Sequence, residues 1–397
     1  MDVTLLDRAL GSGIPYITYA IPVFFALIGI EAAAGAVLGR RCYRLNDSFS
    51  DLACGITDQV VGLFLKTALF AGYLFCYGFV TSRALNLVDV GRYTPAGRWV
   101  AAITLLLGVD LAYYWFHRIA HEWNAPWAGH VVHHSSEEYN LTVALRQGAL
   151  QAAFSWVFYL PLALLGFPPL WFLAVSAFDT LYQFWIHTRL IGRLGPLEWV
   201  FNTPSHHRVH HARNPQYLDR NYAGVLIIWD RMFGTFQAED EEPVYGLTKP
   251  LNSWNPVWAN LHVWADMWRD AARAPAWADR LRVWFAPQGW RPAGLPPRPP
   301  APPVDPARPF LYDARPKPPV WVYVSLQFAV TLAFAVYILA RADTITDRLL
   351  LASAAAFTVW SLSNLAGLIE RRRWAFASEM VRLAVAAAVV WRLAASA

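Results

Sequence analysis

Six apolar stretches of this chain are each long enough to cross a lipid bilayer as a helix, which requires roughly 20 residues. They cover residues 14–38, 58–82, 98–116, 320–340, 348–368 and 375–394. Charged residues make up 15% of the 397 residues, against about 25% in soluble domains. The chain therefore has too little polar surface to face water on all sides. We predict an all-α fold, a polytopic integral membrane helical bundle.

One further apolar stretch, residues 149–186, is too long for a single span. Pro161, Gly166, Pro168 and Pro169 interrupt it near the middle, where they favour a break in the helix. We interpret the stretch as a helical hairpin whose two arms enter and leave on the same side of the membrane. The first run, in contrast, is too long for the apolar core of a signal peptide, so we expect it to be a retained anchor.

Arginine clusters indicate how the spans are oriented. Arg40 and Arg41 follow the first run, and the triplet 371–373 separates the last two. Cytoplasmic loops carry an excess of basic residues, so both clusters are expected in the cytoplasm. Alternation of the spans then places the end of the 98–116 run, both ends of the hairpin and the segment 188–319 on that same face. We predict a cytoplasmic cap there.

Ten of the eleven histidines fall between residues 117 and 211. They form H-x-x-x-H at 117–121, H-x-x-H-H at 130–134 and H-x-x-H-H at 207–211, with His187 and His206 between the last two clusters. Imidazole is the commonest metal ligand, and this spacing places ligands on one face of a helix. One zinc ion uses only three or four protein ligands. The sequence therefore predicts two metal ions in a histidine-rich cap, with His206 outside the last triplet and pointing elsewhere.

Several enzyme classes are disfavoured by motifs that the chain lacks. His121-Glu122 is followed by Trp-Asn-Ala, so there is no H-E-x-x-H zinc peptidase motif, and no P-loop or dinucleotide-binding glycine pattern is present. No basic patch interleaved with aromatics points to nucleic acid. The three cysteines form no C-x-x-C pair, which argues against a thiolate site. Imidazole suits Zn, Cu, Fe and Ni alike, but oxygen chemistry at two irons would use all the ligands.

A different class of protein remains open at this point. A membrane metal transporter or metal-binding protein would also be rich in histidine. Such a protein would distribute its ligands along a pore within the spans, whereas these histidines gather at span ends and in one loop.

Several longer strings resemble the fatty acid hydroxylase / sterol desaturase superfamily of membrane di-iron enzymes. They are HVVHHSSEEYNLT at 130–142, ALRQ at 144–147, LYQFWIHT at 181–188, NTPSHHRVHH at 202–211 and NYAGVLIIWD at 221–230. The resemblance extends from about residue 100 to residue 250. These strings are far more specific than histidine spacing alone, and they are most similar to the members that act on alkylglycerol ether lipids.

The resemblance implies hydroxylation of the ether-linked carbon with O2 and tetrahydrobiopterin, followed by collapse to a fatty aldehyde and a glycerol derivative. It implies the metal ligands His117, His121, His130, His133, His134, His187, His207, His210 and His211. Glu122 resembles an acidic residue of the family, and we predict Glu122 and His206 as catalytic or supporting residues. Gln183 stands where relatives often have a histidine, which would leave one metal with an open position. The alternative activity is a sterol, carotenoid or fatty acyl hydroxylase or desaturase.

We therefore expect four regions. Residues 1–97 are N-terminal spans, 98–250 a di-iron catalytic domain, 251–319 a cytoplasmic proline-rich connector and 320–397 C-terminal spans. The expected partners are a lipid from the bilayer, O2 and an electron donor, either the pterin or a redox protein. An arginine- and alanine-rich composition suggests a bacterial cytoplasmic membrane, or the endoplasmic reticulum in a eukaryote. Candidate contacts to the lipid head or the pterin are Glu137, Glu138, Tyr139, Asn140, Arg146 and Gln147.

Overall fold

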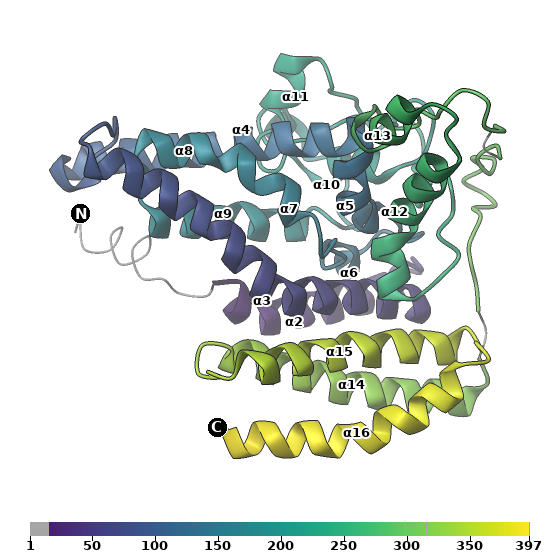
Figure 1. Cartoon of the computed structure of the whole chain (residues 1–397). Coiled ribbons are helices and arrows are strands. Elements are labelled where there is room, and N and C mark those ends of the chain that lie inside the picture. Colours follow the sequence, from purple (N-terminus) through teal and green to yellow (C-terminus); the bar gives the residue numbers. More distant parts are fainter. Residues whose placement is uncertain (1–15, 298, 315, 397) are drawn as a thin grey trace.

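The computed structural model describes residues 16–297, 299–314 and 316–396, and this part of the chain is helical, with isolated bridges but no strand. Figure 1 shows long helices in two layers. The larger layer contains α2 (Tyr16–Val37), α3 (Leu45–Ser82), α4 (Pro95–Glu122) and α9 (Pro169–Trp185). The other contains α14 (Pro318–Arg341), α15 (Arg348–Ile369) and α16 (Ala375–Ser396). The prediction of an all-α polytopic membrane fold is confirmed.

Five helices of the described chain are long and apolar enough to cross a membrane. They are Tyr19–Val37 within α2, and the whole of α3, α4, α14 and α15. Helix α16 forms at the predicted position but is not among the five, and it carries Glu379, Arg382 and Arg392. The first two residues of the predicted run 14–38 lie outside the described residues.

Two of these helices extend beyond their predicted spans. Helix α3 begins at Leu45 rather than residue 58, and α4 continues to Glu122 rather than ending at residue 116. The added turns are more polar, so hydropathy alone does not detect them. A helix that leaves the bilayer can continue into the cap because its backbone hydrogen bonds are made within the helix itself. This extension puts His117 and His121 on the same helix.

The apolar stretch at 149–186 forms the predicted hairpin. Its first arm is divided into α7 (Ala152–Ser155), η2 (Trp156–Tyr159) and α8 (Leu160–Leu165), and its second arm is α9. Gly166 makes the turn with φ +99°, and a Cβ there would lie 2.7 Å from the carbonyl oxygen of Val88. Glycine is therefore required by both backbone conformation and space. The arms pack against α3 and α4.

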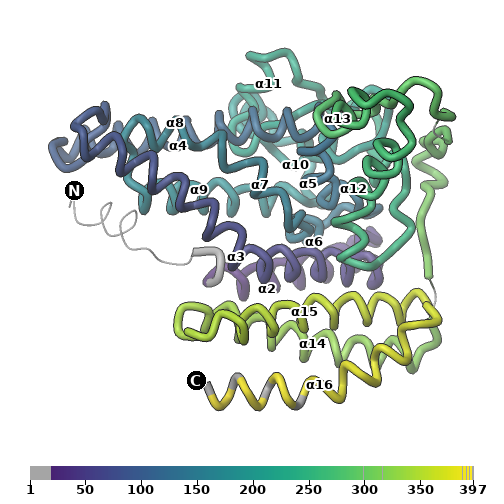
Figure 2. The backbone as a smooth tube through the Cα atoms, in the orientation of Figure 1, coloured from purple at the N-terminus to yellow at the C-terminus, as the bar shows by residue number. Residues whose placement is uncertain are grey.

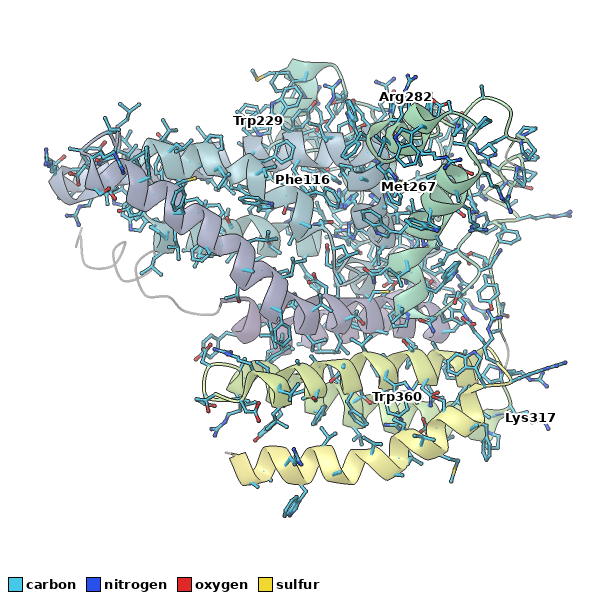
Figure 3. All side chains as sticks on the ribbon, viewed as in Figure 1. Phe116, Trp229, Met267, Arg282, Lys317 and Trp360 are labelled. Carbon is cyan, nitrogen blue, oxygen red and sulfur yellow. The ribbon has the colours of Figure 1, made fainter. Side chains whose placement is uncertain are left out.

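The three C-terminal helices form the layer that Figure 2 shows in yellow and yellow-green beneath α3. Helix α15 packs on both α14 and α16, and α14 and α15 contact α3. Trp360 on α15, labelled in Figure 3, donates a hydrogen bond of 2.9 Å to the hydroxyl of Ser378 on α16. This layer therefore lies directly against α3, and α15 also contacts α12.

The cap lies at one end of the long helices, on the right of Figure 1. Its elements are α5 (Asn124–His134), α6 (Leu141–Ala144), η3 (Gly195–Trp199), α10 (Pro204–His211), α11 (Ile228–Phe233), α12 (Pro256–Arg273) and α13 (Trp277–Phe285), whereas the short helix η1 (Val90–Arg92) lies at the opposite end of the bundle, between α3 and α4. Two of these, α12 and α13, occupy the region predicted as a connector. The Asn255 side chain accepts hydrogen bonds from the backbone N–H of Val257 and Trp258 and so begins α12. Helix α12 then packs against α5.

Candidate metal centre

Three helices and one loop bring nine imidazoles together. Helix α4 ends with His117 and His121, α5 ends with the second cluster, and α10 carries the third. His187 follows the end of α9. All nine are buried, and none exceeds 6% exposure. The helical spacing of the clusters thus turns their rings toward one interior volume.

The nine rings divide into two groups whose ligand atoms lie within 4.8 Å of one another. The first group contains His117, His121, His130, His134 and His210, and the second contains His133, His187, His207 and His211. The groups adjoin each other, since the rings of His134 and His211 stack with centroids 4.4 Å apart. Each group can hold one metal ion.

Hydrogen bonds to one ring nitrogen fix the tautomer of several of these imidazoles. The Nδ1 atoms of His117, His133 and His187 lie 2.7, 2.9 and 2.7 Å from backbone carbonyl oxygens. The Nδ1 atom of His130 lies 2.7 Å from the side-chain oxygen of Gln151. A carbonyl oxygen can only accept, so Nδ1 carries the proton and Nε2 keeps its lone pair.

These Nε2 atoms face each other at the spacing of ligands around a shared ion. The Nε2 atoms of His117 and His130 are 3.0 Å apart, and those of His133 and His187 are 3.3 Å apart. Two nitrogens bound at about 2.1 Å and at right angles on one metal would lie about 3.0 Å apart. Facing lone pairs repel, and buried acceptors without a donor are costly. The residues therefore fit a metal ion in each group.

Burial keeps these rings neutral and able to bind metal. Desolvation lowers the pKa of the His130 and His187 imidazoles to about 4. Desolvation, with a further contribution from neighbouring imidazoles, lowers the pKa of His133 and His207 well below its usual range. Near pH 7 each ring is uncharged, which is the form that binds a metal ion.

A cavity of about 430 Å³ connects the histidines with the membrane helices. His130, His133 and His187 line one side of it, and both metal groups are thus represented in its wall. Apolar side chains of α2 and α14 line another part, namely Ile21, Phe24, Phe25, Leu332, Ala335, Val336 and Leu339. Its volume is in the range of sites for small organic ligands. The cavity can bring an apolar molecule from the membrane to the histidines.

Comparison with known proteins identifies the family. The model of the fatty acid hydroxylase family matches residues 102–235, the range that holds all nine imidazoles. Alkylglycerol monooxygenase of Homo sapiens is 39% identical over 373 residues, which cover 92% of this chain and 80% of that protein. The chain belongs to the alkylglycerol monooxygenase family. The Xenopus tropicalis member of this family is 38% identical over 371 residues, with the same coverage.

A more distant similarity extends beyond the alkylglycerol monooxygenase family. The ornithine lipid hydroxylase of Rhizobium tropici is 34% identical over 200 residues, which cover 49% of this chain and 58% of that protein. No solved structure matches this one significantly. Together with the membrane helices, these similarities make the protein a lipid-hydroxylating monooxygenase of the membrane.

Glu122 and His206 belong to neither of the two histidine groups. Both were predicted as catalytic or supporting residues. The Glu122 carboxylate accepts a hydrogen bond of 2.8 Å from Arg118, one turn earlier on α4. The His206 ring packs edge-on against Phe236, with centroids 5.4 Å apart. Within the described chain, neither side chain forms a hydrogen bond to one of the nine imidazoles. Their catalytic roles stay predictions.

The residues predicted to contact a lipid head or a pterin mostly stabilise the loop between α5 and α6. Only Gln147 lines the cavity. Arg146 is 1% exposed and forms an ion pair of 3.1 Å with Asp51 of α3. Glu137 and Glu138 pair with Arg44, Asn140 caps α6, and the Tyr139 hydroxyl donates to the carbonyl of Ile186. These bonds join the second histidine cluster to α3 and to the segment around His187.

Sequence reasoning missed several residues that surround the histidines. Asp219 has its carboxylate 3.7 Å from Nδ1 of His121. Asp58, Gln59 and Lys66 on α3 line the cavity. Asp58, Gln59 and Lys66 could have been found from the sequence by their position at the start of the apolar run 58–82. Charged side chains are rare in such runs and are usually functional.

Proposed function

We propose that this protein is a di-iron monooxygenase that cleaves the O-alkyl bond of alkylglycerol ether lipids. The observation that carries the proposal is the pair of histidine groups beside a cavity that reaches the membrane helices. Support also comes from alkylglycerol monooxygenases that match 92% of the chain. An apolar tail lying along the cavity would bring the first carbon of the alkyl chain toward both groups.

The proposed reaction replaces a hydrogen on the ether-linked carbon by a hydroxyl group. A pair of iron ions held by the nine imidazoles would supply the O2 activation that an unreactive C–H bond requires. One oxygen atom enters the substrate and the other leaves as water, with two electrons and two protons from a donor. The resulting hemiacetal loses its C–O bond and gives a fatty aldehyde and a glycerol derivative.

The protein's own residues position and shield this chemistry. Backbone carbonyls hold the Nδ1–H groups of His117, His133 and His187, so that the Nε2 atoms keep their orientation. The group of four has one imidazole fewer than the group of five. We assign the open coordination position to the group of four, where Gln183 stands close by in the cavity wall.

The electron donor and the orientation of the protein are part of the proposal. We propose tetrahydrobiopterin as the donor by family resemblance, with a redox protein as the alternative. The cap then faces the cytoplasm, where either donor is dissolved, and the protein resides in a bacterial cytoplasmic membrane or, in a eukaryote, the endoplasmic reticulum. The basic residues Arg40 and Arg41 lie after α2 at the cap end, as the positive-inside tendency requires.

A direct test uses purified protein with 1-O-hexadecylglycerol, O2 and tetrahydrobiopterin. We expect hexadecanal and glycerol, and about two iron ions per chain by elemental analysis. Aldehyde formed only with a redox protein would exclude the pterin and leave the ether cleavage intact. Labile zinc and its movement across vesicles, without aldehyde, would instead indicate a metal transporter. A stable hydroxylated lipid that is not cleaved would indicate the acyl hydroxylase alternative, which the similarity to ornithine lipid hydroxylase favours.

A further inference from the structure

Three polar side chains stand within a membrane-spanning helix and line the cavity. Lys66 and Asp58 of α3 form an ion pair with Nζ 2.8 Å from Oδ2. The side-chain N–H of Gln59 donates to the same Oδ2 atom at 2.8 Å. Asp58 is largely buried, with a side-chain exposure of 7%, whereas that of Lys66 is 46%. We call these three residues the α3 polar patch.

A glycine on α3 leaves room for the Lys66 side chain to lie along the helix. Gly62 lies midway between Asp58 and Lys66, four residues from each, and therefore on the same face of the helix. A Cβ at Gly62 would lie 3.0 Å from Cδ and 3.3 Å from Nζ of Lys66. The lysine side chain thus extends along the helix over the glycine, back toward the cap end of α3. The ammonium group is held at Asp58 rather than extended outward into lipid.

An ion pair within a membrane-spanning helix costs free energy, and such residues are usually kept for a function. Ionisable residues in membrane spans are rare and usually face a cavity in which they act. The pair is neutral overall, because the carboxylate balances the ammonium group. It nevertheless presents strong hydrogen-bond donors and acceptors beside the apolar side chains of α2 and α14 that line the same cavity. Such a surface suits an uncharged ligand with several hydroxyl groups.

We infer that the α3 polar patch binds the free hydroxyl groups of the glycerol head of the substrate. This inference rests on the proposed function and names the part of the site that selects the head group. A diol can donate to Asp58 and accept from Lys66 and Gln59 without separating the ion pair. A phosphate group would compete with Asp58 for the lysine and leave the carboxylate unpaired. The alkyl chain then lies along the apolar side chains of α2 and α14.

Binding measured without turnover tests the inference. Purified full-length protein is kept free of O2 and reductant, and its affinity is measured for 1-O-hexadecylglycerol and for hexadecyl propyl ether, which has no hydroxyl group. The unaltered protein should bind the diol about 10- to 100-fold more tightly, because hydrogen bonds to charged groups are the stronger kind. The double variant Asp58→Asn/Lys66→Met and the single variant Gln59→Leu should weaken binding of the diol, with the hydroxyl-free ether bound as before.

Lys249→Met provides the matched control, since Lys249 forms an ion pair with Asp266 in the cap, away from the cavity. It should leave both affinities unchanged. The inference is overturned if the patch variants keep the preference for the diol, or if a phosphate-bearing ether lipid binds the unaltered protein more tightly than the diol. The proposed function fails separately, if the diol binds through the patch but the iron-loaded protein with donor and O2 releases no aldehyde.

Discussion

The Nδ1 atom of His130 lies 2.7 Å from the side-chain oxygen of Gln151, and both residues line the cavity. Gln151 follows α5 by 17 positions and lies at the start of the hairpin, just before α7. The amide therefore fixes a ring of the five-histidine group from an element outside the histidine clusters. It makes the hairpin part of the metal centre.

Replacing this amide should weaken metal binding while the fold is kept. Gln151→Leu removes the acceptor of the His130 N–H, and loss of such a partner typically costs about 10- to 100-fold in metal affinity. Competition with a chelator measures the affinity for iron. Gln147→Leu is the matched control, because Gln147 lines the cavity but donates to the backbone of Ala144. Equal iron affinity in the two variants would contradict the assignment.

Substituting a histidine inside one of the two groups should lower the metal content, whereas substituting a histidine outside both groups should not. His133→Ala removes one of the four rings in the second group, so metal content per chain and turnover should fall together. His206→Ala removes a ring that packs on Phe236, outside both groups, and should leave metal content unchanged. Elemental analysis of both purified variants decides the matter. Full metal content in His133→Ala would remove that residue from the site.

Arg146 should matter for stability rather than for head-group binding. Its guanidinium is buried against Asp51, so Arg146→Met leaves an unpaired buried carboxylate, a change that typically costs about 3–5 kcal/mol. Removing an exposed ion-pair partner with Lys249→Met should cost about 1 kcal/mol or less. Chemical denaturation in detergent compares the variants. The double variant Asp51→Asn/Arg146→Met should recover part of the loss, and no recovery would argue against coupling of the two residues.

Helix α14 should limit the length of the alkyl chain. Val336 lines the cavity, and Val336→Trp would fill space that the tail requires. Each methylene excluded from apolar surroundings costs about 0.8 kcal/mol, so losing two or three should raise KM for an octadecyl substrate about 10- to 100-fold. A dodecyl substrate should be affected much less. Val330→Trp, on the same helix but 63% exposed and outside the cavity lining, should change neither value.

The sequence was sufficient to predict that the histidines lie together. Their helical spacing and the alternation of the spans both place the clusters at one end of the bundle, and the hairpin returns His187 to the same end. The all-α architecture followed from the apolar runs alone. The full lengths of α3 and α4 were not predicted, because hydropathy detects the part of a helix that lies in lipid and not its continuation into the cap.

Contacts between side chains that are far apart in the sequence could not be predicted from local sequence patterns. Arg146 meets Asp51, 95 positions earlier, only because α3 continues below the cap and passes the loop after α5. Lys66 and Asp58 are eight residues apart on one helix, a rise of about 12 Å. Their contact depends on how the lysine extends over Gly62, which no periodicity reveals. For the same reason the cavity itself was not foreseen, since α2, α3 and α14 meet there from distant parts of the chain.

Part of the cavity wall is built by helices that do not carry the metal ligands. The helices α2, α3 and α14 lie outside the matched range 102–235 and supply no imidazole. Mutations in them can change which molecule is admitted while the oxidising machinery is inherited intact. Substrate selection by these three helices is therefore separable, residue by residue, from the binding of the metal ions.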